Sequence, residues 1–286
     1  MPPSLDLDAY FARIGYDGAP RVDERTLWEL HAAHITAIPY ETLDIQLGQE
    51  KILDEQAMFE KIVGRRRGGW CYEMNGLLSA ALRQIGFEVD RLGGAVARHL
   101  IGDETIGNHM VLVVHLDGHE IVADAGLGDG PLFPFPLEER AWDEDGFAFQ
   151  LAPADDGWWR FTNHEHGLAP AFDFTTEARD LEWYRPQATK LQTDPNSIFA
   201  QLAMTIRRDR DGIRVLRDLT YLEIEGKSKT ERRITERDDY VRTLKALIDF
   251  DLGGDVDRLF ERVSERVRKR EAEHARLVAA ADTANA

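Results

Sequence analysis

The 286-residue chain is poor in cysteine, in long apolar runs and in positive charge. Its single cysteine, Cys71, excludes an intramolecular disulfide and fits a reducing cytoplasm. No window approaches the roughly 18 consecutive apolar residues of a membrane span, and the aspartates of segment 1–18 do not fit a secretory signal. A formal net charge of -17 disfavours nucleic acids and anionic membranes as partners. The composition therefore predicts a soluble, acidic, cytoplasmic protein that binds neither nucleic acid nor membrane.

The spacing of apolar residues changes along the chain. From residue 4 to about 86 the apolar residues recur at helical spacing, and one such stripe runs from Cys71 to Ile85 and ends at Gly86. From Phe87 the period falls towards two, which predicts strands. From about residue 196 a short mixed segment, further strands and two helical patterns follow. The chain order is therefore helical bundle, antiparallel β region and α/β unit.

Cys71 lies in the stretch "RGGWCYEMNG", just behind Gly68 and Gly69. A lone cysteine on the apolar face of a helix is more often a packing residue than a catalyst. Cys71, however, occupies the first turn of its predicted helix, where free N–H groups and the helix dipole stabilise a thiolate. The same N–H groups can hold the oxygen of a tetrahedral intermediate, and the two glycines let another backbone or a ligand approach. The arginine run 65–67 adds positive charge, although such runs are more often solvated.

A nucleophilic cysteine needs a base and a group that orients the base. The dipeptide Asp117-Gly118 predicts a two-residue hairpin turn. Continuing the strand pairing from this turn makes Asp124 the diagonal neighbour of His109 on one sheet face, within hydrogen-bonding reach. Such a carboxylate fixes the imidazole tautomer and supports its positive charge. The alternatives are that His109 is a strand-end histidine bonded to water and that Asp124 only introduces the following turn. The spacing does not show that the pair faces Cys71.

Other histidines and glycines carry weaker signals. His164 and His166 flank Glu165 in "NHEHG", but without a cysteine partner or an HExxH pattern we expect no metal there. His31 and His34 share a helix face and are expected to be packing residues. The loop "AGLGDG" is not followed by a helical pattern, so it is not a dinucleotide-binding fingerprint, although a ligand can still approach its backbone.

Several blocks occur together in a characteristic order. They are "YFARIGYDG", "LHAAHITAIPYETLDIQLG", "RRRGGWCYEMNGLLSAALRQIGFEV", "NHMVLVVHL", "IVADAGLGDG" and "DPNSIFAQLAMTIRR". In this order the chain resembles the arylamine N-acetyltransferases, especially the bacterial members. The resemblance is dense from about residue 10 to 130 and looser beyond, and the block around Cys71 is its most specific part.

The resemblance implies an α+β fold. The expected units are a helical bundle over 1–86 that carries the nucleophile, a central antiparallel β-barrel over 87–195 that carries the histidine and aspartate, and an α/β lid over 196–286. It also implies a catalytic core related to that of cysteine proteases. In this core Cys71 is the acyl-accepting nucleophile, His109 its base and Asp124 the residue that orients the base.

The implied reaction is acetyl-CoA-dependent N-acetylation of arylamines and arylhydrazines by a ping-pong mechanism with an acetyl-cysteine intermediate. Acetyl-CoA is then a co-substrate, no metal is needed, and a homodimer is compatible with the resemblance. The alternatives are a macrolactam-forming amide synthase of the same fold, a cysteine hydrolase or amidase, and a non-enzymatic scaffold.

Three positions depart from the family pattern in the region that lines the acceptor pocket of relatives. Tyr40 and Leu127 stand where Phe is usual, and Asn108 stands where Thr is frequent. Loss of an aromatic ring at position 127 reduces stacking against an aryl acceptor and enlarges the pocket. The positions expected to contact substrate or CoA are Tyr40, Trp70, Val96, Asn108, Gly126, Leu127 and Gly128.

Overall fold

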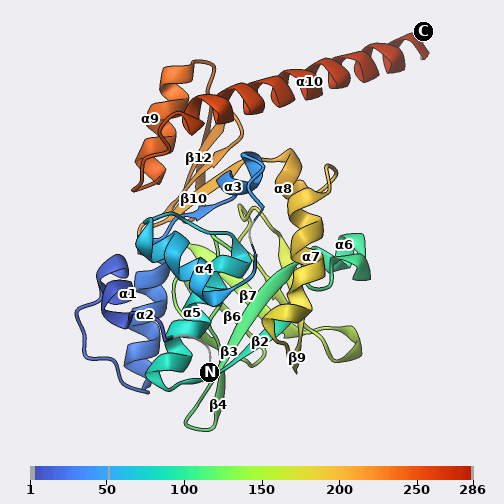
Figure 1. The fold of residues 1–286 in the computed structure, drawn as a ribbon. Helices are drawn as coiled ribbons and strands as arrows, with labels where there is room; N and C mark the ends of the chain where they lie inside the picture. The colour runs from blue at the N-terminus through green and yellow to red at the C-terminus, as the bar shows by residue number, and fades with distance from the viewer. Residues whose placement is uncertain (1–3, 51, 285–286) are drawn as a thin grey trace.

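The structure is a computed structural model that describes residues 4–50 and 52–284. Its N-terminal part is helical, as the spacing predicts (Figure 1). The elements are α1 (Leu7–Ile14), α2 (Glu24–Ala37), α3 (Leu43–Gln46), α4 (Glu55–Phe59), a π-helical turn (Glu60–Gly64) and α5 (Cys71–Ile85).

Local sequence explains where these helices begin and end. The side chain of Asp23 caps α2 by accepting a hydrogen bond from the Thr26 N–H at 2.8 Å. Helix α5 starts at Cys71 and ends at Gly86, which has the left-handed φ of 118° that glycine adopts readily. The predicted start and end of this helix are confirmed.

The central part is an eight-stranded antiparallel sheet in the order β5-β4-β3-β2-β9-β8-β7-β6. Ring centroids of Phe135 on β5 and Trp142 on β6 lie 4.7 Å apart, so the sheet curls until its two edge strands approach each other. Its strands are β2 (Glu88–Val96), β3 (His109–Leu116), β4 (His119–Val122), β5 (Phe135–Pro136), β6 (Arg140–Glu144), β7 (Phe147–Pro153), β8 (Trp159–Thr162) and β9 (Ala171–Ala178).

The hairpin of β3 and β4 has the predicted register. Leu116 pairs with His119 across the turn, and the ladder continues to Val113 opposite Val122. Both turn residues have positive φ, 51° at Asp117 and 81° at Gly118. The turn therefore sets the pairing that the sequence predicts.

Helices also occur within residues 87–195, the range for which the resemblance implies a β-barrel. Helix α7 (Leu181–Thr193) follows β9, and the Asp180 side chain caps it by accepting from the Trp183 N–H at 2.9 Å. Tyr184, Ala188 and Leu191 recur at helical spacing and are buried, which gives the helix its packing face. A short helix, α6 (Arg98–Ile101), also follows β2. The unit boundaries stay predictions.

The C-terminal part is a second antiparallel sheet accompanied by helices. The order is β1-β10-β11-β12-β13, so that β1 (Tyr40–Glu41), from the helical part, forms one edge. The remaining elements are α8 (Ile198–Gln201), β10 (Met204–Arg208), β11 (Ile213–Arg217), β12 (Thr220–Glu225), β13 (Ser228–Arg233), α9 (Arg237–Leu247) and α10 (Asp255–Ala284). In Figure 1 the far end of α10 projects away from the rest of the chain. Within the described ranges, no helix is both long and apolar enough to cross a membrane.

Candidate active site

Cys71 is the first residue of α5, and its side chain is buried. Its thiol donates a hydrogen bond to the backbone oxygen of Asn108, with 3.8 Å between sulfur and oxygen. The Glu73 carboxylate accepts a hydrogen bond from the backbone N–H of Trp70 at 3.2 Å, which fixes the start of the helix. The predicted position of Cys71 in the first helical turn is confirmed.

The glycines before Cys71 admit another backbone. The Gly69 N–H donates to the Pro39 oxygen at 3.2 Å, and the Glu41 N–H donates to the Gly69 oxygen at 2.9 Å. A Cβ on Gly68 would lie 2.2 Å from the Pro39 oxygen, so no larger residue fits. The sequence leaves open whether another backbone or a ligand approaches these glycines. In the structure the backbone of segment 39–41 lies against them.

Two arginines of the run 65–67 contact carboxylates. Arg66 contacts Asp249 at 3.1 Å. Arg67 contacts Glu41 at 3.1 Å and Asp44 at 2.8 Å, and its side chain is largely buried. The expectation of a solvated run is therefore wrong for Arg67, because the fold brings two carboxylates of residues 41–44 beside it.

A buried lysine joins the same carboxylates. Lys61, in the π-helical turn, places Nζ 2.7 Å from Glu73, 3.1 Å from Asp44 and 3.7 Å from Glu41. Burial raises the pKa of the Glu73 carboxyl, and the positive charge of Lys61 opposes that rise. We call Lys61, Arg67, Glu41, Asp44 and Glu73 the support cluster. Periodicity does not predict this cluster, although Lys61 and Glu73 both stand among buried apolar positions.

His109 and Asp124 form the predicted pair. His109 Nε2 lies 2.7 Å from Asp124 Oδ2, and both side chains are buried. Burial alone would lower the pKa of His109, but the charge of Asp124 and this hydrogen bond raise it to about 10. The Cys71 side chain interacts with the same imidazole and adds to the rise. Burial would raise the pKa of Asp124, but His109 and the hydrogen bonds to the carboxylate hold it below its usual range.

Asn75 completes this arrangement, and no sequence motif predicts its role. Its side-chain amide donates to Asp124 Oδ1 at 2.7 Å and to the Met110 oxygen at 2.6 Å, and its oxygen accepts from the Ala125 N–H at 2.8 Å. Asn75 stands four residues after Cys71, so both lie on one helix face. A buried asparagine within an apolar stripe was the available signal.

Two of the expected substrate contacts bind each other. The Val96 N–H donates to Asn108 Oδ1 at 2.7 Å, and Asn108 Nδ2 donates to the Val96 oxygen at 3.3 Å. The Asn108 side chain thus acts like a backbone partner for the end of β2, while its own backbone oxygen accepts from Cys71.

The glycines of the loop after Asp124 pack closely against protein atoms. A Cβ on Gly126 would lie 2.6 Å from Asn75 Nδ2 and 2.9 Å from the Cys71 oxygen. Gly128 has a φ of 84°, and a Cβ there would lie 3.0 Å from Cγ of Tyr40. Contact of CoA with these glycines stays a prediction.

Aromatic residues lie on both sides of Cys71 in the sequence and pack on one another. The Trp70 ring lies edge-on to Tyr72, with 4.8 Å between centroids, and edge-on to Phe199 of α8 at 5.3 Å. Leu127 is half-buried and packs against the core. Trp70 and Tyr72 are both buried, so these edge-on contacts belong to the packing around the start of α5.

The helical histidines pack in the core as predicted. His31 Nδ1 hydrogen-bonds the Leu132 oxygen at 3.0 Å, and His34 Nδ1 hydrogen-bonds the Tyr10 hydroxyl at 2.9 Å. Burial lowers the pKa of His34 to about 3, so it stays neutral.

The histidines of "NHEHG" bind different backbone oxygens. His164 Nε2 lies 3.2 Å from the Asp129 oxygen, and His166 Nε2 lies 3.0 Å from the Lys227 oxygen. Among the residues that the structure describes, no group of three or more His, Cys, Asp or Glu side chains is arranged to hold a metal ion.

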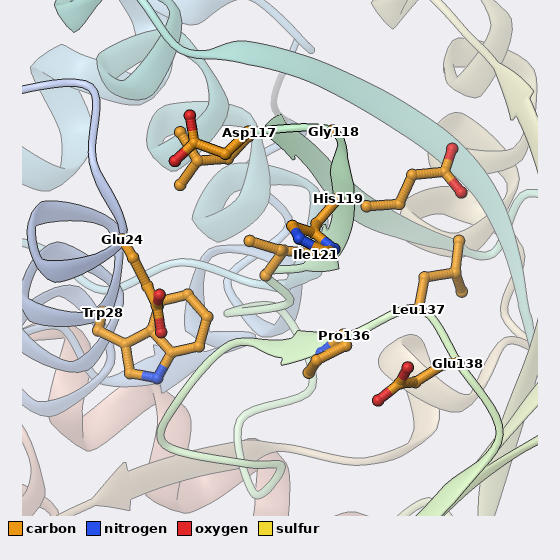
Figure 2. A pocket seen from close by; sticks show the side chains of 11 residues that line it. Glu24, Trp28, Asp117, Gly118, His119, Ile121, Pro136, Leu137 and Glu138 are labelled. Atoms are coloured by element: carbon orange, nitrogen blue, oxygen red, sulfur yellow. The ribbon is translucent and has the colours of Figure 1, made fainter.

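A surface pocket of about 730 Å³ lies elsewhere on the molecule. Figure 2 shows its lining, which comprises Glu24 and Trp28 of α2, the hairpin turn 116–121 and residues 136–138. Neither Cys71, His109 nor Asp124 lines it. The pocket is therefore separate from the arrangement around Cys71.

A family model described as N-acetyltransferase matches residues 23–256. The mouse (Mus musculus) arylamine N-acetyltransferase 2 is 31% identical over 273 residues, which cover 84% of this chain and 93% of that protein. This chain belongs to the arylamine N-acetyltransferase family. The arylamine N-acetyltransferase of Mycolicibacterium smegmatis is 38% identical over 217 residues, or 68% of this chain and 74% of that protein.

Solved arylamine N-acetyltransferases share the fold. The Mycobacterium abscessus structure has a TM-score of 0.82 at 28% identity and covers 91% of this chain and 95% of its own. The Mycobacterium marinum structure in complex with CoA has a TM-score of 0.82 at 27% identity. The match covers 91% of this chain and 99% of the M. marinum chain. The predicted family and the α+β fold class are confirmed, and the chain is an acyltransferase of the arylamine N-acetyltransferase family.

Proposed function

We propose that this enzyme N-acetylates arylamines and arylhydrazines with acetyl-CoA, by a ping-pong mechanism through Cys71, His109 and Asp124. The observation that carries the proposal is the 2.7 Å contact between His109 and Asp124, whose imidazole also interacts with the Cys71 side chain. The Mycobacterium marinum relative in complex with CoA supports acetyl-CoA as the donor. The names of the relatives support an arylamine as the acceptor.

The first half-reaction transfers the acetyl group to sulfur. His109 accepts the proton of the Cys71 thiol, and Asp124 stabilises the resulting imidazolium. The thiolate attacks the acetyl carbonyl carbon, so that a new C–S bond forms and the π electron pair moves to oxygen. When this pair returns, the C–S bond to CoA breaks, and the CoA thiolate takes the proton from His109. Acetyl-Cys71 and free CoA are the products.

The second half-reaction regenerates the cysteine. The nitrogen of the acceptor attacks the thioester carbon, and His109 removes a proton from that nitrogen. The C–S bond to Cys71 then breaks, the N-acetylated product leaves, and the sulfur departs as a thiolate paired with the His109 imidazolium. Trp70, Phe199 and Tyr40 supply the rings against which an aryl acceptor would pack.

The test separates the two half-reactions. With acetyl-CoA and no amine, we expect release of one equivalent of CoA and an acetylated Cys71 peptide in mass spectrometry. Adding an arylamine or arylhydrazine from a panel should discharge the acetyl group onto nitrogen. Cys71→Ser should do neither while keeping its circular dichroism spectrum and melting temperature.

Two outcomes would contradict the proposal. Near-wild-type transfer by Cys71→Ser would exclude Cys71 as the acyl carrier. If acetyl-CoA is hydrolysed continuously, and at the same rate in the presence and absence of an amine, the protein is instead a cysteine hydrolase.

A further inference from the structure

A backbone carbonyl lies beside the sulfur of Cys71. The Asn108 oxygen accepts a hydrogen bond from the Cys71 thiol, with 3.8 Å between oxygen and sulfur. Asn108 directly precedes His109, so this oxygen belongs to the same segment as the proposed base. The two half-reactions use the imidazole of His109 and leave the Asn108 oxygen without a role.

Hydrogen bonds to three neighbouring segments hold this carbonyl in place. The Asn108 side chain pairs with Val96 of β2 through two hydrogen bonds, of 2.7 and 3.3 Å. The Asn108 backbone N–H donates to the Thr105 oxygen at 2.9 Å. The Tyr72 hydroxyl, on α5, donates to the oxygen of Gly107, the residue before Asn108. Because its backbone and its side chain are both tied, Asn108 keeps its oxygen directed at Cys71.

Acetylation removes the donor from this oxygen. In acetyl-Cys71 the sulfur carries the acetyl carbon in place of hydrogen, so the Asn108 oxygen faces a thioester that has no hydrogen to donate. An acceptor that loses its hydrogen bond costs free energy, which a ligand with a donor hydrogen regains. The attacking amine is such a ligand, because its nitrogen must come within about 3–3.5 Å of the thioester carbon, and that carbon is bonded to the sulfur.

We propose that the Asn108 backbone oxygen accepts a hydrogen bond from the amine that attacks acetyl-Cys71, and thereby selects acceptors with an NH2 group. The inference rests on the proposed function, since it assigns a further catalytic residue to the second half-reaction. As the nitrogen lone pair forms the C–N bond, His109 removes one hydrogen as a proton and the other donates to Asn108. The second hydrogen stays on the amide product when the C–S bond breaks. A secondary amine has a single hydrogen, so it cannot serve both residues.

Two amines test the second hydrogen bond in the wild-type enzyme. Acetyl-Cys71 is prepared with acetyl-CoA, freed of CoA and discharged in single turnover by aniline or by N-methylaniline. The two amines have similar basicity, but N-methylaniline has only one hydrogen on nitrogen. One hydrogen bond corresponds to a rate factor of roughly 5 to 10, so we expect aniline to react faster by this factor. Equal rates with the two amines would overturn the inference.

The Asn108→Ala variant separates the hydrogen bond from crowding by the methyl group. It loses both bonds to Val96 that direct the carbonyl, so discharge by aniline should fall roughly 5- to 10-fold, while discharge by N-methylaniline changes little. Acetylation of Cys71 by p-nitrophenyl acetate, which has no N–H group, should stay near the wild-type rate. An unchanged ratio of the two amine rates would overturn the inference, as would an equal fall in acetylation and discharge.

Ser79→Ala is the matched control. It also removes two side-chain hydrogen bonds, to the Gly76 oxygen and from Arg91, without touching the segment before His109. We expect the wild-type ratio of the two amine rates, at a lowered melting temperature. A ratio that falls in Ser79→Ala as it does in Asn108→Ala would overturn the inference, because the ratio would then follow stability. Failure of the proposed function shows separately, as a wild-type protein whose Cys71 is not acetylated by acetyl-CoA.

Discussion

Asn75 donates a hydrogen bond to Oδ1 of Asp124 at 2.7 Å, while Oδ2 of the same carboxylate bonds His109. Asn75 and Cys71 both lie on α5, so the helix that carries Cys71 also orients the carboxylate that holds His109, the proposed base. The link couples the start of the helix to the sheet that holds the histidine.

The Asn75→Ala variant tests this link. It leaves the Met110 oxygen and the Ala125 N–H buried without partners, which should lower the free energy of unfolding by about 3 kcal/mol. Because Asp124 also loses a donor, we expect at least roughly 10-fold slower acetyl transfer. Ser79→Ala, one turn further along α5, is the control, and it should lose stability while keeping the transfer rate. Equal transfer rates in both variants would contradict a role for Asn75 in positioning Asp124.

Gly126 and Gly130 provide a matched pair of substitutions in one loop. In Gly126→Ala the new Cβ would lie 2.9 Å from the Cys71 oxygen, which is buried backbone and has little room to shift. We expect a loss of about 1–3 kcal/mol in unfolding free energy and a strong loss of transfer. In Gly130→Ala the nearest atom is the Leu127 side chain at 3.3 Å, which can move. Melting temperatures and transfer rates that fall equally in the two variants would exclude this packing argument.

The raised pKa of His109 predicts how stability depends on pH. The unfolded imidazole loses its proton near pH 6.5, roughly its ordinary pKa, whereas folded His109 keeps it up to a pKa of about 10. The stability from the pair is therefore complete below about pH 6.5 and is lost as the pH rises from there towards 10. Urea unfolding of the wild type and of Asp124→Asn should show a stability difference that shrinks over this range. A difference that stays constant would mean that His109 is not charged in the folded protein.

Reaction with iodoacetamide tests whether Cys71 and His109 form an ion pair. A thiolate held by an imidazolium is alkylated quickly even below pH 7. His109→Gln should slow this reaction, because it removes the positive partner of the thiolate. An alkylation rate that rises only near the ordinary thiol pKa of about 8.5 would count against the ion pair.

Lys61 and Glu73 of the support cluster should be energetically coupled. Lys61→Met removes the cation that contacts the buried carboxylates of Glu41, Asp44 and Glu73, which should cost about 3–5 kcal/mol of stability. Glu73→Gln removes one charge but keeps an acceptor for the Trp70 N–H. The double variant should therefore be more stable than the sum of the single effects by about 1–3 kcal/mol in chemical unfolding. Additive effects would show that the 2.7 Å contact between Lys61 and Glu73 contributes little to the free energy of unfolding.

The sequence predicts local features of this site well. A two-residue turn at Asp117-Gly118 sets a strand register, and register decides which side chains are neighbours, so the contact of His109 with Asp124 follows from short-range rules. The start of α5 at Cys71 follows in the same way from the apolar stripe and from the glycines around it.

Contacts between distant elements are harder to predict. Periodicity shows that Lys61, Glu73 and Asn75 stand among inward-facing positions, but it does not identify their partners on other elements. Local rules also argue against helix α7, because Pro186 lies inside it and proline within a pattern normally indicates a helix end. The meeting of Cys71 with His109 came from the family resemblance, because no local rule relates α5 to the sheet.

The two-residue strand β1 has a consequence for biosynthesis. Tyr40 and Glu41 pair with β10, which the ribosome makes long after the helical part and the curled sheet. A nascent chain released before β10 would contain Cys71, His109 and Asp124, yet the segment that braces Gly69 would be an open strand edge. The surroundings of Gly69, two residues before Cys71, would thus reach their final arrangement late in translation.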